Sequence, residues 1–302
     1  MLSVVLGLYA YTGATLAWDS LSAGDVRRVV IGSKTFTEQY ILSAIMARRL
    51  ERETVVPTRL LQSLGSTVAF DALQSGDIDV YVDYSGTIWA TVMRRETTPD
   101  DRALVMRETE RFLRDEHDIT LVGALGFENA YALAVRASDA DRLGLRRISD
   151  LVAHAPRMSI GGDYEFFARP EWAAIQETYG LRFQRRRSMD ASLMYQAAVQ
   201  GDVDVISAFS TDGRIAAFDL RVLEDERGAI PPYDAVILAS ARVRRELPEV
   251  LASLRGLTNT IDADRMRRMN LAVDERGDTP AEVAERFLQE LAGPGTADPG
   301  SP

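Results

Sequence analysis

The sequence predicts an α/β protein built from two similar halves that face each other across a ligand cleft. The first observation is an internal repeat, in which residues 75–87 (SGDIDVYVDYSGT) return as residues 200–212 (QGDVDVISAFSTD). The second is an upstream echo, because VIGS at 30–33 precedes the first copy and SIGG at 159–162 precedes the second. The third is a length of 302 residues with 46% hydrophobic residues, which is enough for two cores.

Each copy of the repeat reads as the end of a helix, a tight turn, a buried strand and a site residue. A glycine, Gly76 or Gly201, closes an amphipathic stretch, and the β-branched run that follows stops at Tyr84 or Phe209. Ligands of open α/β sheets bind beyond the carboxyl ends of the strands, so we expect these two aromatics on opposite walls of one cleft. The alternative is that GDxDV is only a common turn-to-strand sequence.

The first half begins with a buried strand at 29–32, followed by an amphipathic helix. Thr35 and Glu38 have the spacing of a capping box at the start of this helix. The turns at Ser33 and Ser66 each precede a predicted helix. Helix amino termini present free backbone N–H groups, so both turns are candidate positions for holding a carboxylate.

The chain then crosses between the halves. A strand-rich run over 120–135 is expected to contain the first crossing, and a return near Arg214 or near Ala239 fits the pattern. The remaining chain, 243–291, has helical periodicity. The predicted division is 28–127 plus 240–292 for the first lobe, 128–239 for the second lobe, and 293–302 for a disordered Gly/Pro tail.

Residues 1–24 do not fit the soluble fold. Residues 2–18 carry no charge, and a small-residue cleavage site precedes Trp18, although a positively charged start is missing. We expect a signal peptide, an uncleaved membrane anchor, or the end of a membrane segment from a fused permease. Each of these places the folded part in the periplasm or another extracytoplasmic space, and a core helix is the remaining alternative.

Composition restricts the partners. The formal net charge of −10 argues against nucleic acid and anionic membrane surfaces, and modestly favours a cationic ligand. The absence of cysteine excludes disulfides and thiolate metal sites. Lys34 is the single lysine, and its role stays open.

No catalytic set is recognisable. HExxH, GxSxG, Walker-type and GxGxxG motifs are absent, and the two histidines, His117 and His154, fall in a charged helix and a surface-like connection. The acidic pair in each repeat, such as Asp77 and Asp79, reads as turn and strand-edge residues. The sequence therefore predicts no enzyme, no cofactor and no metal site.

Four aromatic residues do converge. Tyr84 and Phe209 end the repeat strands, Tyr131 follows the crossing, and Tyr233 follows a Pro-Pro turn that would fix its backbone. Each alone also fits a core position. Together, facing rings form a box whose negative π faces attract a quaternary ammonium, a cation without N–H donors.

At these residues the chain resembles the extracytoplasmic binding proteins of osmoprotectant ABC importers, the glycine betaine, choline and carnitine family. The likeness covers about 29–291 and rests on five segments: 31–39 (IGSKTFTEQ), 76–87, 126–131 (GFENAY), 210–214 (STDGR) and 223–233.

The resemblance implies a type II periplasmic-binding-protein fold, in which two lobes close on the ligand. It implies a cage of Tyr84, Tyr131, Tyr233 and Phe209, with Phe209 standing where many relatives have tyrosine. It further suggests contacts from Thr87, the Asn129 backbone and Arg169, although FFARPE at 166–171 departs from the family's commoner ending. A guanidinium suits a ligand carboxylate.

The predicted function is therefore the solute-binding component of an ABC importer. It would capture a quaternary-ammonium osmoprotectant such as glycine betaine, choline or carnitine and deliver it to a permease and its ATPase subunits. The alternatives are a receptor of the same fold for ergothioneine, an amino acid or a polyamine, and an enzyme on the same frame.

Overall fold

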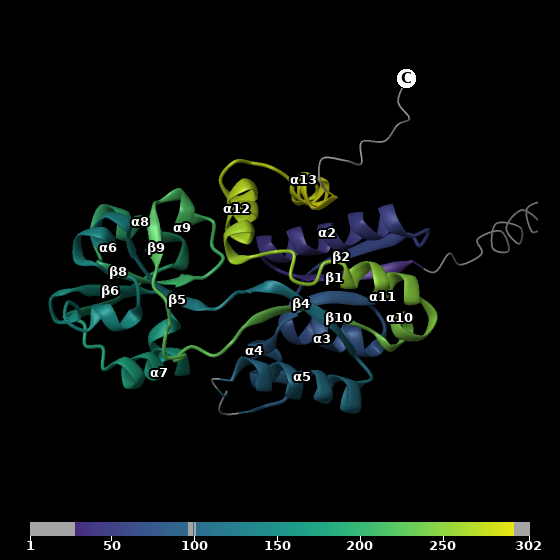
Figure 1. The fold of residues 1–302 in the computed structure, drawn as a ribbon, viewed down its shortest axis with the longest axis horizontal. Coiled ribbons are helices and arrows are strands. Elements are labelled where there is room, and N and C mark those ends of the chain that lie inside the picture. The colour runs from purple at the N-terminus through teal and green to yellow at the C-terminus, as the bar shows by residue number, and fades with distance from the viewer. Residues whose placement is uncertain (1–27, 96–98, 100, 293–302) are drawn as a thin grey trace, which may run out of the picture.

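The computed structural model describes residues 28–95, 99 and 101–292. The predicted signal or anchor at 1–24 and the predicted tail at 293–302 lie outside these residues. The described chain forms two separate mixed sheets, each with its own helices, which lie along the long axis of the molecule (Figure 1). The predicted two-lobed α/β fold is confirmed.

The two sheets have the same topology. In the first sheet the order is β2 (Thr58–Leu64), β1 (Val29–Lys34), β3 (Val80–Tyr84), β10 (Asp234–Ala239) and β4 (Thr120–Glu128). In the second it is β7 (Arg185–Ser188), β6 (Ser159–Gly162), β8 (Val205–Phe209), β5 (Tyr131–Arg136) and β9 (Leu220–Val222). In both, the first three strands run parallel and the fourth is antiparallel to the third. The repeat strands β3 and β8 are therefore the central strands of equivalent sheets.

Acidic residues of the repeat form hydrogen bonds within these sheets, from the turn and strand-edge positions predicted for them. The carboxylate of Asp79 accepts the backbone N–H of Val30 at 2.8 Å, and that of Asp204 accepts the N–H of Ser159 at 2.8 Å. In each lobe the second aspartate of GDxDV thus joins the repeat strand to its parallel neighbour. Both aspartates lie at the amino ends of these strands, away from the carboxyl ends.

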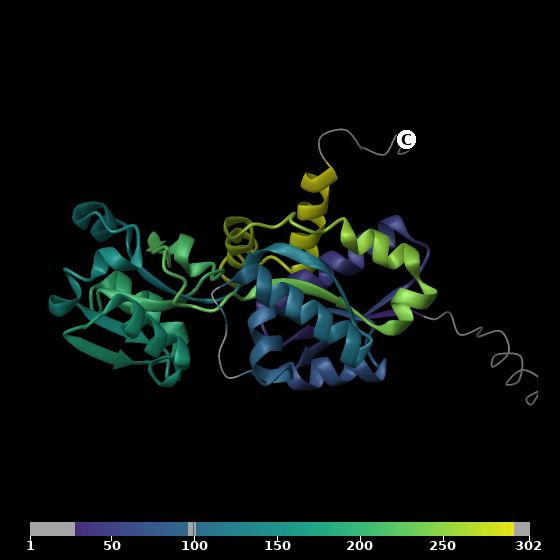
Figure 2. The ribbon, with the colours of Figure 1, turned by 60° about the horizontal axis from the view of Figure 1, so that its bottom comes forward.

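Helices cover both faces of each sheet (Figures 1 and 2). The first lobe has α2 (Thr37–Glu53), α3 (Ser66–Ser75), α4 (Ser85–Thr87), a π-helical turn (Ile88–Val92), α5 (Arg102–His117), α10 (Ala241–Glu246), α11 (Pro248–Arg255), α12 (Ala263–Asp274) and α13 (Pro280–Ala292). The second has α6 (Ala137–Leu143), α7 (Pro170–Tyr179), α8 (Ala191–Gln200), α9 (Arg214–Ala217) and three short 3₁₀ turns (Ile148–Leu151, Ala155–Arg157, Phe166–Ala168).

Each sheet packs one apolar cluster on each face. In the first lobe α2, α11, α12 and α13 share a cluster on one face, while α3 and α5 pack against the other. In the second lobe two further clusters lie on the α6–α7 side and on the α8–α9 side. The buried positions of α2 include Ile41, Leu42, Ile45, Met46 and Leu50, which is the three-and-four spacing of a core-facing helix.

The chain passes between the sheets twice. The first passage lies between β4 and β5, within the predicted run. The second lies between β9 and β10, which is earlier than the predicted return at Ala239 and later than the alternative at Arg214. The reason is that β10 is buried along its whole length and pairs with both β3 and β4, so it completes the first sheet. Within the described ranges, no helix is long and apolar enough to span a membrane.

Candidate site between the two sheets

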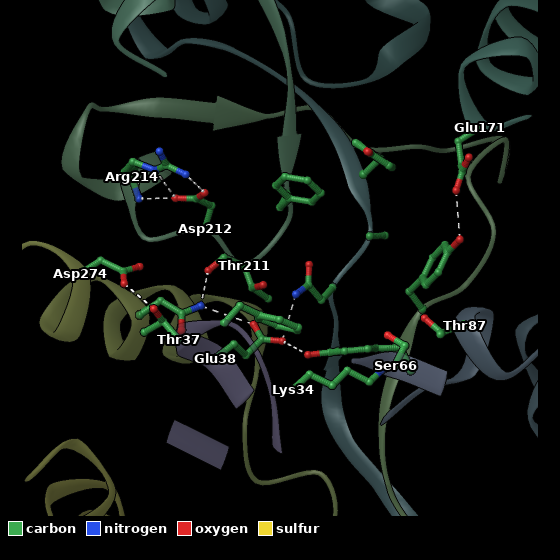
Figure 3. Close-up of a pocket in the computed structure, with 18 of the residues that line it drawn as sticks. Lys34, Thr37, Glu38, Ser66, Thr87, Glu171, Thr211, Asp212, Arg214 and Asp274 are labelled. Carbon is green, nitrogen blue, oxygen red and sulfur yellow. Dashed lines mark hydrogen bonds and ion pairs between the residues drawn. The ribbon is translucent and has the colours of Figure 1, made fainter. Parts of the chain in front are cut away.

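A cavity of about 500 Å³ lies between the lobes, at the carboxyl ends of β3 and β8 (Figure 3). Eight of the nine predicted site residues line it: Ser66, Tyr84, Thr87, Asn129, Tyr131, Arg169, Phe209 and Tyr233. The ninth, Ser33, does not line it. The side chain of Ser33 is fully buried, and its hydroxyl oxygen has no hydrogen-bond partner. The next residue, Lys34, lines the cavity instead.

The aromatic residues form two groups. Tyr131 and Phe209 are paired in register across β5 and β8, which sets their ring centroids 5.0 Å apart. In the first lobe the ring of Tyr84 stacks on Phe36, with centroids 6.3 Å apart and planes 24° from parallel. Phe36 was missed by the sequence analysis, although it lies inside the segment 31–39 on which the resemblance rests. The cavity is therefore lined by aromatic rings from both lobes.

Tyr233 comes from the return passage, packs closely on Gly86 and forms a hydrogen bond with the second lobe. Gly86 leaves room for its ring, because a β-carbon at that position would lie 2.7 Å from the ring and 2.8 Å from the Pro232 carbonyl oxygen. The Tyr233 hydroxyl donates to Glu171 Oε1 at 3.0 Å, a contact with the second lobe. Burial and the Glu171 carboxylate together raise the pKa of Tyr233 to about 12, so the hydroxyl stays protonated as a donor.

Glu38 is the principal residue that the sequence analysis misassigned. The predicted capping box with Thr35 does not form, because α2 begins after Phe36 and has no side-chain cap. Instead the Glu38 carboxylate is buried and lines the cavity. It accepts hydrogen bonds from the Tyr84 hydroxyl at 2.6 Å and from the Asn129 amide at 3.1 Å. Burial raises its pKa above the ordinary carboxyl value, against the hydrogen bonds that lower it.

The two cations nearest the rings are paired with carboxylates. Lys34 is buried and forms an ion pair with Asp83, and its ammonium lies 5.3 Å from the Tyr84 ring centroid. The Arg169 guanidinium bonds Glu171 at 3.0 Å and lies 5.3 Å from the Tyr131 ring centroid. Burial opposes ionisation of Glu171, but Arg169, a backbone N–H and the Tyr233 hydroxyl together keep the pKa of the carboxyl below its usual value.

The other end of the cavity is polar (Figure 3). Asp212 and Arg214 form an ion pair at 2.7 Å, and Thr37 donates to Asp274 at 2.6 Å. Beyond the aromatic rings, the cavity thus also presents acidic, basic and hydroxyl groups. In the part of the chain that the structure describes, no group of three or more histidine or acidic residues is arranged to hold a metal.

A protein-family model for the "substrate binding domain of ABC-type glycine betaine transport system" matches residues 27–290, which is nearly all of the described chain and includes every residue of this site. The chain belongs to this family. Its members bind solutes for ABC transport and are extracytoplasmic.

Relatives agree with this assignment. The chain is 33% identical over 272 residues to the glycine-betaine-binding protein of Pseudomonas aeruginosa, covering 86% of each chain. It is 30% identical over 273 residues to the ergothioneine transport permease/ergothioneine binding protein EgtU of Helicobacter pylori. That match covers 89% of this chain but 49% of the relative, so the chain spans about half the length of that protein.

A crystal structure described as a glycine betaine/carnitine/choline ABC transporter superimposes with a TM-score of 0.83 at 32% identity, covering 87% of this chain and 98% of that one. The glycine betaine complex of lactococcal OpuAC, at 16% identity and a TM-score of 0.56, shares the fold.

Proposed function

We propose that this protein captures a small quaternary-ammonium compound between its lobes and delivers it to an ABC permease. The observation that carries the proposal is the convergence of aromatic rings from both lobes and from the return passage on one cavity. A quaternary ammonium cannot donate an N–H hydrogen bond, so π faces are its natural partners, each contributing about 0.5 to 2 kcal/mol.

The roles follow from position. Tyr84, Tyr131, Phe209 and Tyr233 form the cage, and Phe36 extends it behind Tyr84. A ligand carboxylate would be held by donors at the cavity wall, namely Arg169, Thr87 and the Ser66 turn. The Asn129 backbone N–H, which the resemblance suggested as a further contact, already donates to the Tyr233 carbonyl oxygen at 3.1 Å. Arg169 already shares its guanidinium with Glu171, so binding a carboxylate requires it to divide its five donors between the two.

The polar end supports a second candidate ligand. A cavity of about 500 Å³ lies in the range of ligands much larger than glycine betaine. Asp212, Asp274 and Thr37 offer acceptors beyond the cage, and these suit a betaine whose other end carries N–H donors. Ergothioneine, which appears in the name of the Helicobacter pylori relative, is a betaine whose other end is a ring with N–H donors.

Delivery and location complete the proposal. The protein works outside the cytoplasmic membrane, held there by residues 1–24 or by its permease, and the permease and its ATPase subunits recognise the closed form. We take binding without turnover as the function, because the family's members are substrate-binding domains of a transport system and the cavity is lined by aromatic faces and paired charges.

Isothermal titration calorimetry tests this directly, with glycine betaine, choline, carnitine and ergothioneine against glycine and spermidine as controls. We expect heat only from the quaternary ammonium compounds. Replacing Tyr84 and Tyr233 together with alanine should weaken binding by up to about 1,000-fold, since two cation–π contacts of up to about 2 kcal/mol each are lost. Tyr164→Ala, an exposed tyrosine outside the cavity lining, is the matched control. Unchanged binding in the double variant would remove the cage from the proposal.

A further inference from the structure

One helix of the first lobe touches the second lobe at a place separate from the two passages of the chain. This helix, α12, lies between α2 and α9 (Figure 1). Its residues Met266, Met269 and Ala272 are buried in the first lobe's core. Arg267, Asn270 and Leu271 are three and four positions apart, so they share a face of the helix, and at about 100° per residue this face differs from that of Met266, Met269 and Ala272.

That second face holds the backbone of the loop after β8, residues 210–213. Arg267 Nε donates to the Ser210 carbonyl oxygen at 2.7 Å, and Asn270 Nδ2 donates to the Thr211 carbonyl oxygen at 2.8 Å. Both bonds go to main-chain carbonyls, so they fix the position of the loop whatever side chains it carries. The loop follows directly from Phe209, and its Thr211 and Asp212 line the cavity.

Gly213 permits the closest approach. A β-carbon there would lie 2.5 Å from the Leu271 nitrogen and 2.7 Å from its Cα, which is backbone that cannot rotate away. The φ of Gly213 is −61°, an angle that any residue adopts. Glycine is therefore required at this position for space between the lobes and not for backbone conformation.

We infer that α12 is a third connection between the lobes, in which Arg267, Asn270 and Gly213 are positioning residues that set the lobe separation and place the Phe209–Asp212 wall against the site. The inference rests on the two-lobed frame and is independent of which ligand binds. It goes beyond the cage, because Arg267 and Gly213 have no contact with the proposed ligand.

The test measures the lobe separation without ligand. The chain has no cysteine, so Val55→Cys in the first lobe and Val152→Cys in the second, both exposed, can carry the only two spin labels. Double electron–electron resonance then gives the distance distribution. Arg267→Met removes the guanidinium but keeps the apolar stem. Arg268→Met is the matched control, because Arg268 directly follows Arg267 and is exposed, and among the described residues it has no bond to the second lobe.

We expect Arg267→Met to broaden the distribution and Arg268→Met to leave it unchanged. Gly213→Ala should shift its centre by about 1 Å or more, because an ordinary contact of at least 3.4 Å must replace one of 2.5 Å. If both Arg267→Met and Gly213→Ala reproduce the Arg268→Met distribution, the third connection is refuted. A failure of betaine binding with altered distributions would instead overturn the ligand class and leave this inference standing.

Discussion

At the scale of single residues, the buried Glu38 should make the stability of the fold depend on pH. Its pKa is raised by burial, so between the ordinary carboxyl value of 4.5 and the raised value the folded state holds a proton that the unfolded state has released. The free energy of unfolding must therefore fall as pH rises through this interval. Below pH 4.5 both states are protonated and the effect disappears.

Glu38→Gln should remove this pH dependence while keeping an acceptor for the Tyr84 hydroxyl. In urea unfolding between pH 4.5 and 8, we expect the parent to lose more stability with rising pH than the variant does. Glu110→Gln, an exposed carboxylate on α5, should follow the parent. Parallel curves for the parent and Glu38→Gln would show that Glu38 ionises as readily in the fold as outside it.

Phe209 tests whether the cage needs a ring or a hydroxyl at this wall. Phe209→Tyr keeps the π face, so we expect the dissociation constant of the bound betaine to change by less than about threefold. Phe209→Ala removes a contact of about 0.5 to 2 kcal/mol and should weaken binding by up to about 30-fold. Titration calorimetry of both variants decides, and equal losses in both would show that shape and not the π face matters.

At the scale of elements, the turn after β3 depends on Gly86. Alanine there would force the Tyr233 ring and the Pro232 carbonyl apart. Overpacking of this kind costs about 1 to 3 kcal/mol, and displacing Tyr233 should also weaken ligand binding. Gly65→Ala is the control, since its β-carbon would meet only Val68, at 4.0 Å. Equal urea midpoints for the two variants would contradict the close approach at Gly86.

At the scale of the whole molecule, four apolar clusters are divided between two sheets. The lobes are joined by two passages of chain, by the contact of α12 with the 210–213 loop, and by polar contacts such as the bond from Tyr233 to Glu171. Such lobes are weakly coupled without ligand. A ligand that bonds to both lobes stabilises them jointly, by about 2.7 kcal/mol at 100 times its dissociation constant.

Scanning calorimetry should detect this coupling. Without ligand, the calorimetric enthalpy is expected to exceed the van't Hoff enthalpy, because the lobes unfold in overlapping steps. Saturating ligand should bring the two enthalpies together and raise the melting temperature. Equal enthalpies already in the unliganded protein would mean that the lobes unfold as one unit.

The sequence by itself determined the two equivalent sheets and most of the aromatic residues that line the cavity. Repeat strands, glycine-terminated helices and strand-end aromatics are local patterns, so they are readable before folding. Only the tertiary structure decided that β10 completes the first sheet, that Glu38 faces the cavity instead of capping α2, and that α12 touches the second lobe. These three features depend on contacts between residues far apart in the chain, and no local period or spacing encodes which distant backbone will lie beside them.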